Sequence, residues 1–182
     1  MLFVNQYITA RDCPDAYENR GGHGGYDDEP VNLFVGYVTD NESEDKLLKL
    51  VSESKGCAVL DTGCTNTVCG SRWLDEYIQG LTDHERRLVK EECSNSSFTF
   101  GNGISVTSYK KVTFPCCIGD MRATITTDVV RCNLPLLLSR ASMKRAKMVI
   151  NCETNQIKVN GKKRIVNLKT SSSEHYLLPL SA

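Results

Sequence analysis

The chain has 182 residues, of which 22 are basic and 22 acidic, so it lacks the positive charge that marks many nucleic-acid-binding domains. Its apolar runs are too short to cross a bilayer, and its start, Met1 to Val4, has neither the length nor the basic flank of a signal peptide. The 9 cysteines are irregularly spaced, which fits reduced cytosolic thiols better than a disulfide framework. We therefore expect a globular domain that acts without nucleic acid or membrane.

The first 30 residues differ in composition from the rest of the chain. The glycine-rich stretch 21–25 is followed by the acidic residues 27–29 and by Pro30, a composition typical of flexible polar segments. We expect a tail or linker over 1–30 and one domain over 31–182.

The first part of this domain mixes strands and short helices. Residues 31–38 (VNLFVGYV) are β-branched and aromatic and predict a strand. The charged stretch 41–54 has Leu47, Leu48 and Val51 at helical spacing and predicts a short amphipathic helix. The apolar run 57–60 predicts a buried strand. Apolar residues share one helical face over 71–81, and Thr82 with Glu85 forms a capping box. A helical pair is therefore expected over 71–91.

The second part is mostly strand. Residues 98–107 predict a hairpin, because the Asn-Gly pair within Gly101-Asn102-Gly103 supplies the positive φ angles of a tight turn. Ser139 is expected to cap a helix over 139–147, and the run 134–138 is a buried strand or loop. Further strands are expected at 112–118, 122–130, 148–151, 156–159, 164–168 and 176–180. The fold class is all-β in the sense of mainly β with short helices.

The segment with the clearest chemistry is Asp61-Thr62-Gly63, directly after Ala58-Val59-Leu60. A strand that ends there delivers a carboxylate to a turn. Gly63 lets the backbone pass close to a second carboxylate. Thr62 can form a hydrogen bond that holds two such turns together. Two carboxylates in contact share one proton, so one can act as base and the other as acid. A simple turn after a strand would also favour Asp and Gly, so the triplet alone is a weak signal.

Four segments, one of which contains this triplet, resemble retropepsins, the retroviral-type aspartic proteases of LTR retroelement polyproteins, and the copia-like ones in particular. Residues 58–65 (AVLDTGCT) resemble the active-site strand and turn, with Cys64 where Ala or Ser is commoner. Residues 100–104 (FGNGI) resemble the flap hairpin, and Ile118-Gly119 the turn between the next strands. Residues 136–140 (LLLSR) resemble the segment before the family's helix, with Ser139 in place of the glycine of viral members. The helical pair at 71–91 is an insertion relative to compact viral members.

This resemblance implies a closed β-barrel of the acid-protease type that is active as a homodimer, because the chain has a single Asp-Thr-Gly. It implies an aspartic endopeptidase that cuts its own Gag-Pol polyprotein, in the cytoplasm within a virus-like particle. Asp61, Thr62 and Gly63 would be catalytic, and no cofactor or metal is implied. The substrate-binding residues would be Cys64, Thr65, Gly101, Asn102, Gly103 and Ile104.

A shorter resemblance precedes the domain. Residues 11–14 (RDCP) are similar to the end of a retroviral zinc knuckle, but Ile8 stands where the ligand histidine belongs and no cysteine precedes Cys13. A structural zinc takes about four ligands, so we expect none here.

Other interpretations of the sequence stay open beside this one. The chain could be a catalytically silent retropepsin-like dimerisation module, or a cellular protease related to the ubiquitin-linked retropepsin-like proteins, although no ubiquitin-like segment is visible. Cys57, Cys64, Cys69 and Cys93 invite a metal-site or thiol-protease interpretation, but buried apolar thiols are the commoner case. His175 with Cys152 would make a catalytic dyad without local support. Cys116 and Cys117 should face opposite sides of a strand, and the basic residues 144–147 suit a solvated helix end.

Overall fold

The computed structural model describes residues 41–99, 105–160 and 165–181. The expected tail at 1–30, the expected strand at 31–38 and the glycine turn at 101–103 lie outside the described residues. Within the described residues the fold is mostly β, as predicted, and it is organised around one large mixed sheet and two small ones. No helix in these ranges is both long and apolar enough to span a membrane.

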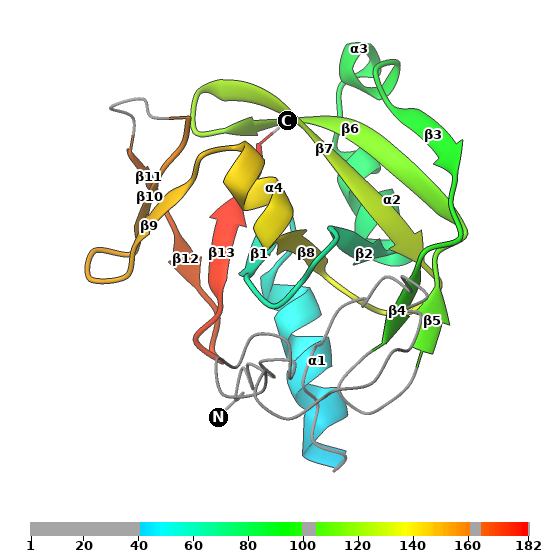
Figure 1. Ribbon diagram of the computed structural model, residues 1–182, viewed down its shortest axis with the longest axis horizontal. Helices are drawn as coiled ribbons and strands as arrows, with labels where there is room; N and C mark the ends of the chain where they lie inside the picture. Colours follow the sequence, from blue (N-terminus) through cyan, green and yellow to red (C-terminus); the bar gives the residue numbers. More distant parts are fainter. Residues whose placement is uncertain (1–40, 100–104, 161–164, 182) are drawn as a thin grey trace, which may run out of the picture.

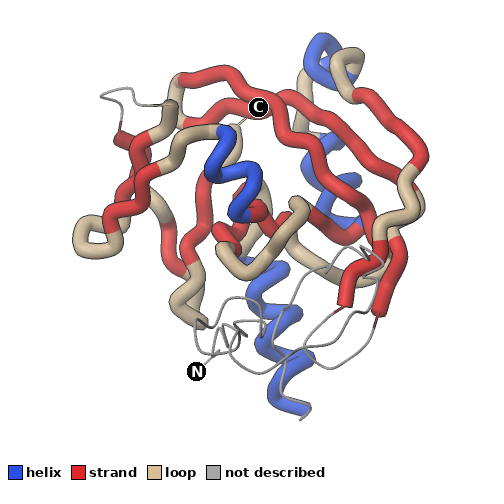
Figure 2. The backbone as a smooth tube through the Cα atoms, viewed as in Figure 1, coloured by secondary structure: helices blue, strands red, loops and turns tan. Residues whose placement is uncertain are grey.

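The large sheet has eight strands, and it brings strands far apart in sequence side by side. Two of its contacts are parallel, β1 with β8 and β2 with β7, and the others are antiparallel. The long β6 and β7 curve across the upper part of the molecule (Figure 2). In hydrogen-bonded order the strands are β12 (Lys169–Thr170), β13 (Tyr176–Pro179), β1 (Cys57–Asp61), β8 (Leu136–Ser139), β2 (Val68–Gly70), β7 (Met121–Val130), β6 (Lys110–Ile118) and β3 (Lys90–Cys93).

The expected closed barrel is not found among the described residues, because the ladder ends at β12 on one edge and at β3 on the other. The nearest approach to closure is one antiparallel bridge between Cys117 of β6 and Ser181, just after β13. Two backbone hydrogen bonds of 2.6 and 3.1 Å form this bridge. At the other edge of the sheet, all four residues of β3 are exposed.

The remaining elements cover the ends and faces of this sheet. Figure 1 shows the small β9–β10–β11 sheet on the left and β3 with α2 and α3 on the right, while α1 lies below β1. The helices are α1 (Asn41–Glu53), α2 (Ser71–Gln79), α3 (Asp83–Arg86) and α4 (Arg140–Arg145). The other strands are β4 (Ser97–Thr99), β5 (Ser105–Thr107), β9 (Val149–Asn151), β10 (Gln156–Lys158) and β11 (Ile165–Asn167).

Aromatic side chains join α2 to the large sheet. Trp73 stacks on Tyr77 with ring centroids 5.3 Å apart, and Tyr77 lies 4.9 Å from Phe114 of β6. The polar atoms of both α2 rings find backbone acceptors, since Trp73 donates to the Ser54 carbonyl at 3.2 Å and Tyr77 to the Pro115 carbonyl at 3.2 Å. The apolar helical face that the sequence predicts is thus buried with its polar atoms satisfied.

Gly70 ends β2 at a point where backbones come very close. A Cβ there would lie 2.2 Å from the Cys132 carbonyl oxygen and 2.7 Å from the Leu134 amide nitrogen. The Gly70 amide donates to the Leu134 carbonyl at 3.0 Å. Only a residue without a side chain allows this approach, which fixes β2 beside the segment that leads into β8.

The helical pair is shorter than the range expected for it, 71–91, because its second helix ends earlier. The capping box of Thr82 and Glu85 is confirmed, but α3 ends at Arg86 and β3 begins at Lys90. Residues 90–93 (KEEC) have no apolar alternation, so a strand was not expected there. They pair with β6 as an exposed edge, where Lys110 forms a 2.8 Å ion pair with Glu91.

Candidate active site

Asp61 is the last residue of β1, a strand held on both sides. β13 pairs with β1 from one side and β8 from the other. Ala58 and Val59 are at most 1 % exposed, so the apolar strand predicted from the sequence does lie inside the sheet. Asp61 itself is partly exposed, and the next two residues are exposed. The strand therefore carries one carboxylate from the core to the surface.

The turn after β1 holds this carboxylate in place. The Gly63 amide donates to Asp61 Oδ1 at 2.9 Å, and the Cys64 amide donates to the Asp61 carbonyl at 3.3 Å. Burial raises the pKa of Asp61, and the amides of Gly63 and Cys64 and the charge of His175 oppose that rise. A carboxyl that retains its proton more readily than usual, and that is still reachable from solvent, is suited to acid–base chemistry.

The residues next to Asp61 differ in their exposure. Thr62, Gly63 and Thr65 are exposed, whereas the predicted substrate contact Cys64 has a side chain that is 1 % exposed. The Cys64 thiol donates to the Asn66 carbonyl at 2.6 Å. Burial, and then the charge of Asp61, raise the pKa of this thiol. Cys64 thus packs under the turn, and Thr62, Gly63 and Thr65 form its surface.

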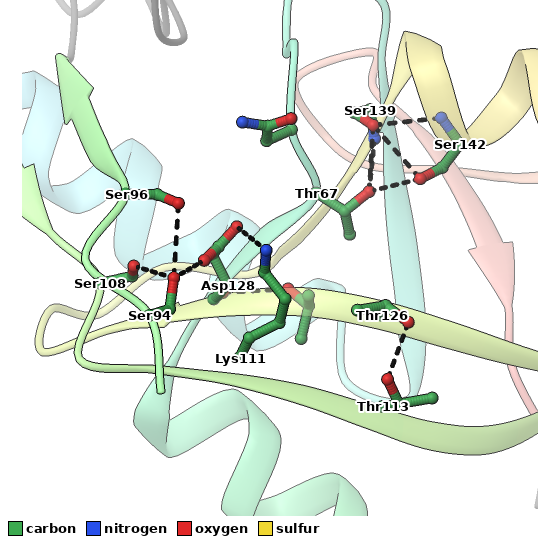
Figure 3. Close-up of polar contacts among 12 residues, drawn as sticks. Thr67, Ser94, Ser96, Ser108, Lys111, Thr113, Thr126, Asp128, Ser139 and Ser142 are labelled. Carbon is green, nitrogen blue, oxygen red and sulfur yellow. Dashed lines mark hydrogen bonds and ion pairs between the residues drawn. The ribbon is translucent and has the colours of Figure 1, made fainter. Parts of the chain in front are cut away.

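A cluster of hydroxyls fixes the turn to the start of α4 (Figure 3). Ser139, which is the parallel-strand partner of Asp61, donates its amide to Thr67 Oγ1 at 3.2 Å. Thr67 Oγ1 also lies 3.1 Å from Ser139 Oγ and 2.8 Å from Ser142 Oγ. The amide of Arg140 donates to the Cys64 carbonyl at 3.1 Å. Four contacts thus lock the segment after Asp61 onto the β8–α4 junction.

Ser139 also caps α4 as predicted, since its Oγ accepts from the Ser142 amide at 3.2 Å. The role of Thr67 was not predicted. No local pattern in the sequence marks a threonine that bonds 72 residues away, and only its place between the Asp-Thr-Gly turn and a short apolar run could have pointed to it.

The base of the hairpin expected over 98–107 is present, whereas its role as a flap stays a prediction. β4 and β5 pair antiparallel with Thr99 opposite Ser105, while its expected substrate-binding residues Gly101, Asn102, Gly103 and Ile104 lie outside the described residues. Phe98 of β4 is fully buried in the cluster that contains Cys64. The base of the hairpin therefore packs on the same apolar group as the Asp61 turn.

A buried carboxylate links this hairpin base to the turn (Figure 3). Asp128 of β7 accepts a hydrogen bond from Ser94 Oγ, and Ser108 Oγ donates to Ser94 Oγ at 2.9 Å. Lys111 Nζ lies 3.9 Å from Asp128 Oδ2. The backbone amide of Asp128 donates to the Thr67 carbonyl at 2.9 Å, which connects β7 to the segment after the Asp61 turn. Sequence reasoning missed Asp128, because nothing local distinguishes it from an ordinary strand residue.

The cysteines and His175 are not arranged as a thiol protease would require. Burial raises the pKa of Cys57 and Cys132, and it raises the pKa of Cys69 and of Cys116 to about 12. Within the described residues, no three His, Cys, Asp or Glu side chains are grouped to hold a metal ion. The ring Nδ1 of His175 lies 3.0 Å from Ser173 Oγ. The residue that contacts Cys152 is Tyr176, whose hydroxyl donates to the Cys152 backbone carbonyl at 3.3 Å.

No family model matches this chain, and no curated protein matches it. Among solved structures it is similar to the retroviral protease-like domain of Ddi1 from Leishmania major, with 15% sequence identity and a TM-score of 0.43. The match covers 61% of this chain and 88% of that domain.

Proposed function

We propose that the chain is an aspartic endopeptidase of the retropepsin type, in which Asp61 from each of two identical subunits activates a water molecule for attack on a peptide bond. One Asp61 carboxylate takes a proton from the water, and the other protonates the scissile carbonyl or the leaving amine.

The observation that carries this proposal is the position of Asp61. It stands at the end of a buried strand, in a turn that is exposed to solvent, with Gly63 bonded to one of its oxygens and burial raising its pKa. The turn is fastened by Thr67 and Ser139 to the segment that resembles the retropepsin motif before the helix. Rigid support of this kind is what a catalytic carboxylate requires.

The thiol alternative is less well supported by the same residues. A nucleophilic cysteine needs a lowered pKa, whereas burial raises the pKa of Cys64, the thiol nearest to Asp61 in sequence. The histidine near the turn, His175, interacts with Asp61. These directions support the carboxyl of Asp61, rather than a thiolate, as the reactive group.

The homodimer follows from the chemistry. The sequence has a single Asp-Thr-Gly, and the dyad needs two carboxylates, so the second comes from another copy through a two-fold contact. From the resemblance to copia-like elements we further propose that the substrate is the polyprotein of a retroelement and that cleavage occurs in the cytoplasm, in a virus-like particle.

The direct test is cleavage of a peptide library by the wild-type chain and by Asp61→Asn, with a statine-type inhibitor and a thiol-alkylating reagent as probes. We expect activity that the inhibitor blocks, that alkylation spares and that Asp61→Asn abolishes. The matched control is Asp45→Asn, because Asp45 is an exposed acid of α1 and its loss should leave activity unchanged.

Two results would contradict the proposal. Alkylation that abolishes activity while the inhibitor has no effect would return attention to the cysteines. A folded wild-type dimer that cleaves no peptide would favour the silent dimerisation module instead.

A further inference from the structure

β13 pairs antiparallel with β1, and His175 immediately precedes β13 at the end where Asp61 terminates β1. Cys57 pairs with Pro179, Ala58 with Leu178 and Val59 with Leu177. The pairing ends at Val59 and Leu177, two residues before Asp61 and two residues after His175. Across an antiparallel pair, residues on one face of the two strands are neighbours. The carboxyl of Asp61 and the imidazole of His175 therefore belong to the same end of the paired strands.

The loop before β13 holds His175 firmly. Its amide donates to Ser171 Oγ at 3.0 Å, and its carbonyl accepts from the Ser171 amide at 2.9 Å. The ring Nδ1 lies 3.0 Å from Ser173 Oγ. Within the described residues Nδ1 is the ring nitrogen that is bonded, so Nε2 remains for a neighbouring group. A ring fixed at its backbone and at one nitrogen is a positioned side chain rather than a mobile surface residue.

The charges around His175 single out Asp61. Burial lowers the pKa of His175, and the charge of Asp61 opposes that change. In the other direction, the charge of His175 opposes the effect of burial on the pKa of Asp61. Each group therefore favours the charged form of the other, as expected for an acid and a base that lie near one another.

Charged residues on the elements around His175 interact with groups other than its ring. On α1, Glu53 accepts from the Ser172 amide at 2.9 Å and interacts with Lys49. On β12, the charge of Lys169 opposes the rise that burial causes in the pKa of the Cys57 thiol. In the loop of His175 itself, Glu174 is exposed and interacts with Tyr176. On the other side of β1, β8 offers the uncharged Ser139 at the level of Asp61.

We propose that His175 is a positioning residue for the Asp61 dyad, whose imidazolium stabilises the facing carboxylate and thereby sets the lower pH limit of proteolysis. This inference rests on the proposed function, and it adds a titratable group from the C-terminal strand to that site. At acidic pH the protonated ring favours ionisation of Asp61, so one carboxylate of the dyad stays available as base. At higher pH the ring is neutral, and this assistance ends.

The functional test compares the pH dependence of kcat/KM for the wild type and His175→Asn. Without the imidazolium the pKa of the dyad rises, so the acidic limb should move to higher pH by about one unit. The basic limb should move less, because His175 is already neutral there. The control is His84→Asn, since His84 is an exposed histidine of α3, and its profile should match the wild type. A parallel loss of activity at every pH, or both limbs unmoved, would overturn the inference.

A second measurement does not depend on activity. NMR titration of the imidazoles in the wild type and in Asp61→Asn should show the pKa of His175 falling by about one unit when the carboxylate is removed, with His84 unchanged. Active wild type with an unaltered His175 titration would overturn this inference alone. Coupled titration in a chain that cleaves nothing would instead contradict the proposed function, and with it the positioning role of His175.

Discussion

Ser139 stands opposite Asp61 in the parallel pairing of β1 and β8, and its amide donates to Thr67 Oγ1 at 3.2 Å. The same Thr67 lies between the turn after Asp61 and the start of α4. The carboxylate that we propose as catalytic is therefore positioned by contacts that involve side chains 72 residues apart in sequence.

Replacing Thr67 with Val tests this arrangement. In this variant a methyl group replaces the Thr67 hydroxyl, so the side chain keeps its shape but the buried Ser139 amide loses its acceptor. This loss should lower the free energy of unfolding by about 1–3 kcal/mol. Activity at 25 °C should fall as well, because the turn loses its support. The control is Thr126→Val, since Thr126 is exposed and its hydroxyl bonds to the hydroxyl of its half-buried pair partner Thr113. Chemical denaturation of both variants makes the comparison, and equal stability of the two would refute the proposed support.

Gly70→Ala tests the close approach of β2 to the segment before β8. A methyl group there would meet the Cys132 carbonyl at 2.2 Å, so backbone must move, and we expect a loss of about 1–3 kcal/mol or more. Gly80→Ala is the matched control, because its Cβ would lie 3.4 Å from the Tyr77 carbonyl and its φ of −77° suits any residue. Thermal melts compare the two, and a Gly70→Ala chain as stable as Gly80→Ala would contradict the structure at this point.

Asp61→Asn should change the pH dependence of stability. Because burial raises the pKa of Asp61 above its ordinary value, the folded state binds its proton more tightly than the unfolded state does. The carboxyl therefore favours folding at low pH, and this contribution is lost as pH rises through the folded pKa. The variant should melt at a higher temperature than the wild type at neutral pH, with the difference shrinking below about pH 4. A difference that is constant across pH would show that Asp61 is not buried in this way.

Thiol reactivity offers an independent check of the fold. Cys93 and Cys152 are exposed, while Cys57, Cys64 and Cys69 are buried and have pKa values that burial raises. Alkylation of the native chain, followed by peptide mass mapping, should modify Cys93 and Cys152 first and the other three only on unfolding. Rapid labelling of Cys64 in the native state would mean that the turn after Asp61 is not packed as the structure has it.

Local patterns in the sequence predicted most of the elements. The helix at 41–53, the capping box at Thr82, the hairpin strands around 97–107 and the Ser139 cap all appear. Each depends on side-chain periodicity or on a cap only a few residues long, which can be read without knowledge of the fold.

The strand pairings between distant parts of the sequence could not be predicted from local patterns. The edge strand β3 has no apolar alternation, and β2 is three residues long, so neither strand was predicted. The sheet was expected to close, but one bridge at Cys117 is what joins β6 to the C-terminal segment. The strands that flank β1 are β8 and β13, which are far away in sequence, and such pairings are set by tertiary packing rather than by local propensity.

Mixing wild-type and Asp61→Asn chains tests the central claim most directly. If the dyad takes one Asp61 from each subunit, then mixed dimers lack one carboxyl and are inactive. Co-refolding equal amounts at a fixed total concentration should leave about one quarter of the wild-type activity, because about one quarter of random dimers carry two intact carboxylates. About one half of the activity would mean that each chain acts alone, and this result would contradict a shared active site.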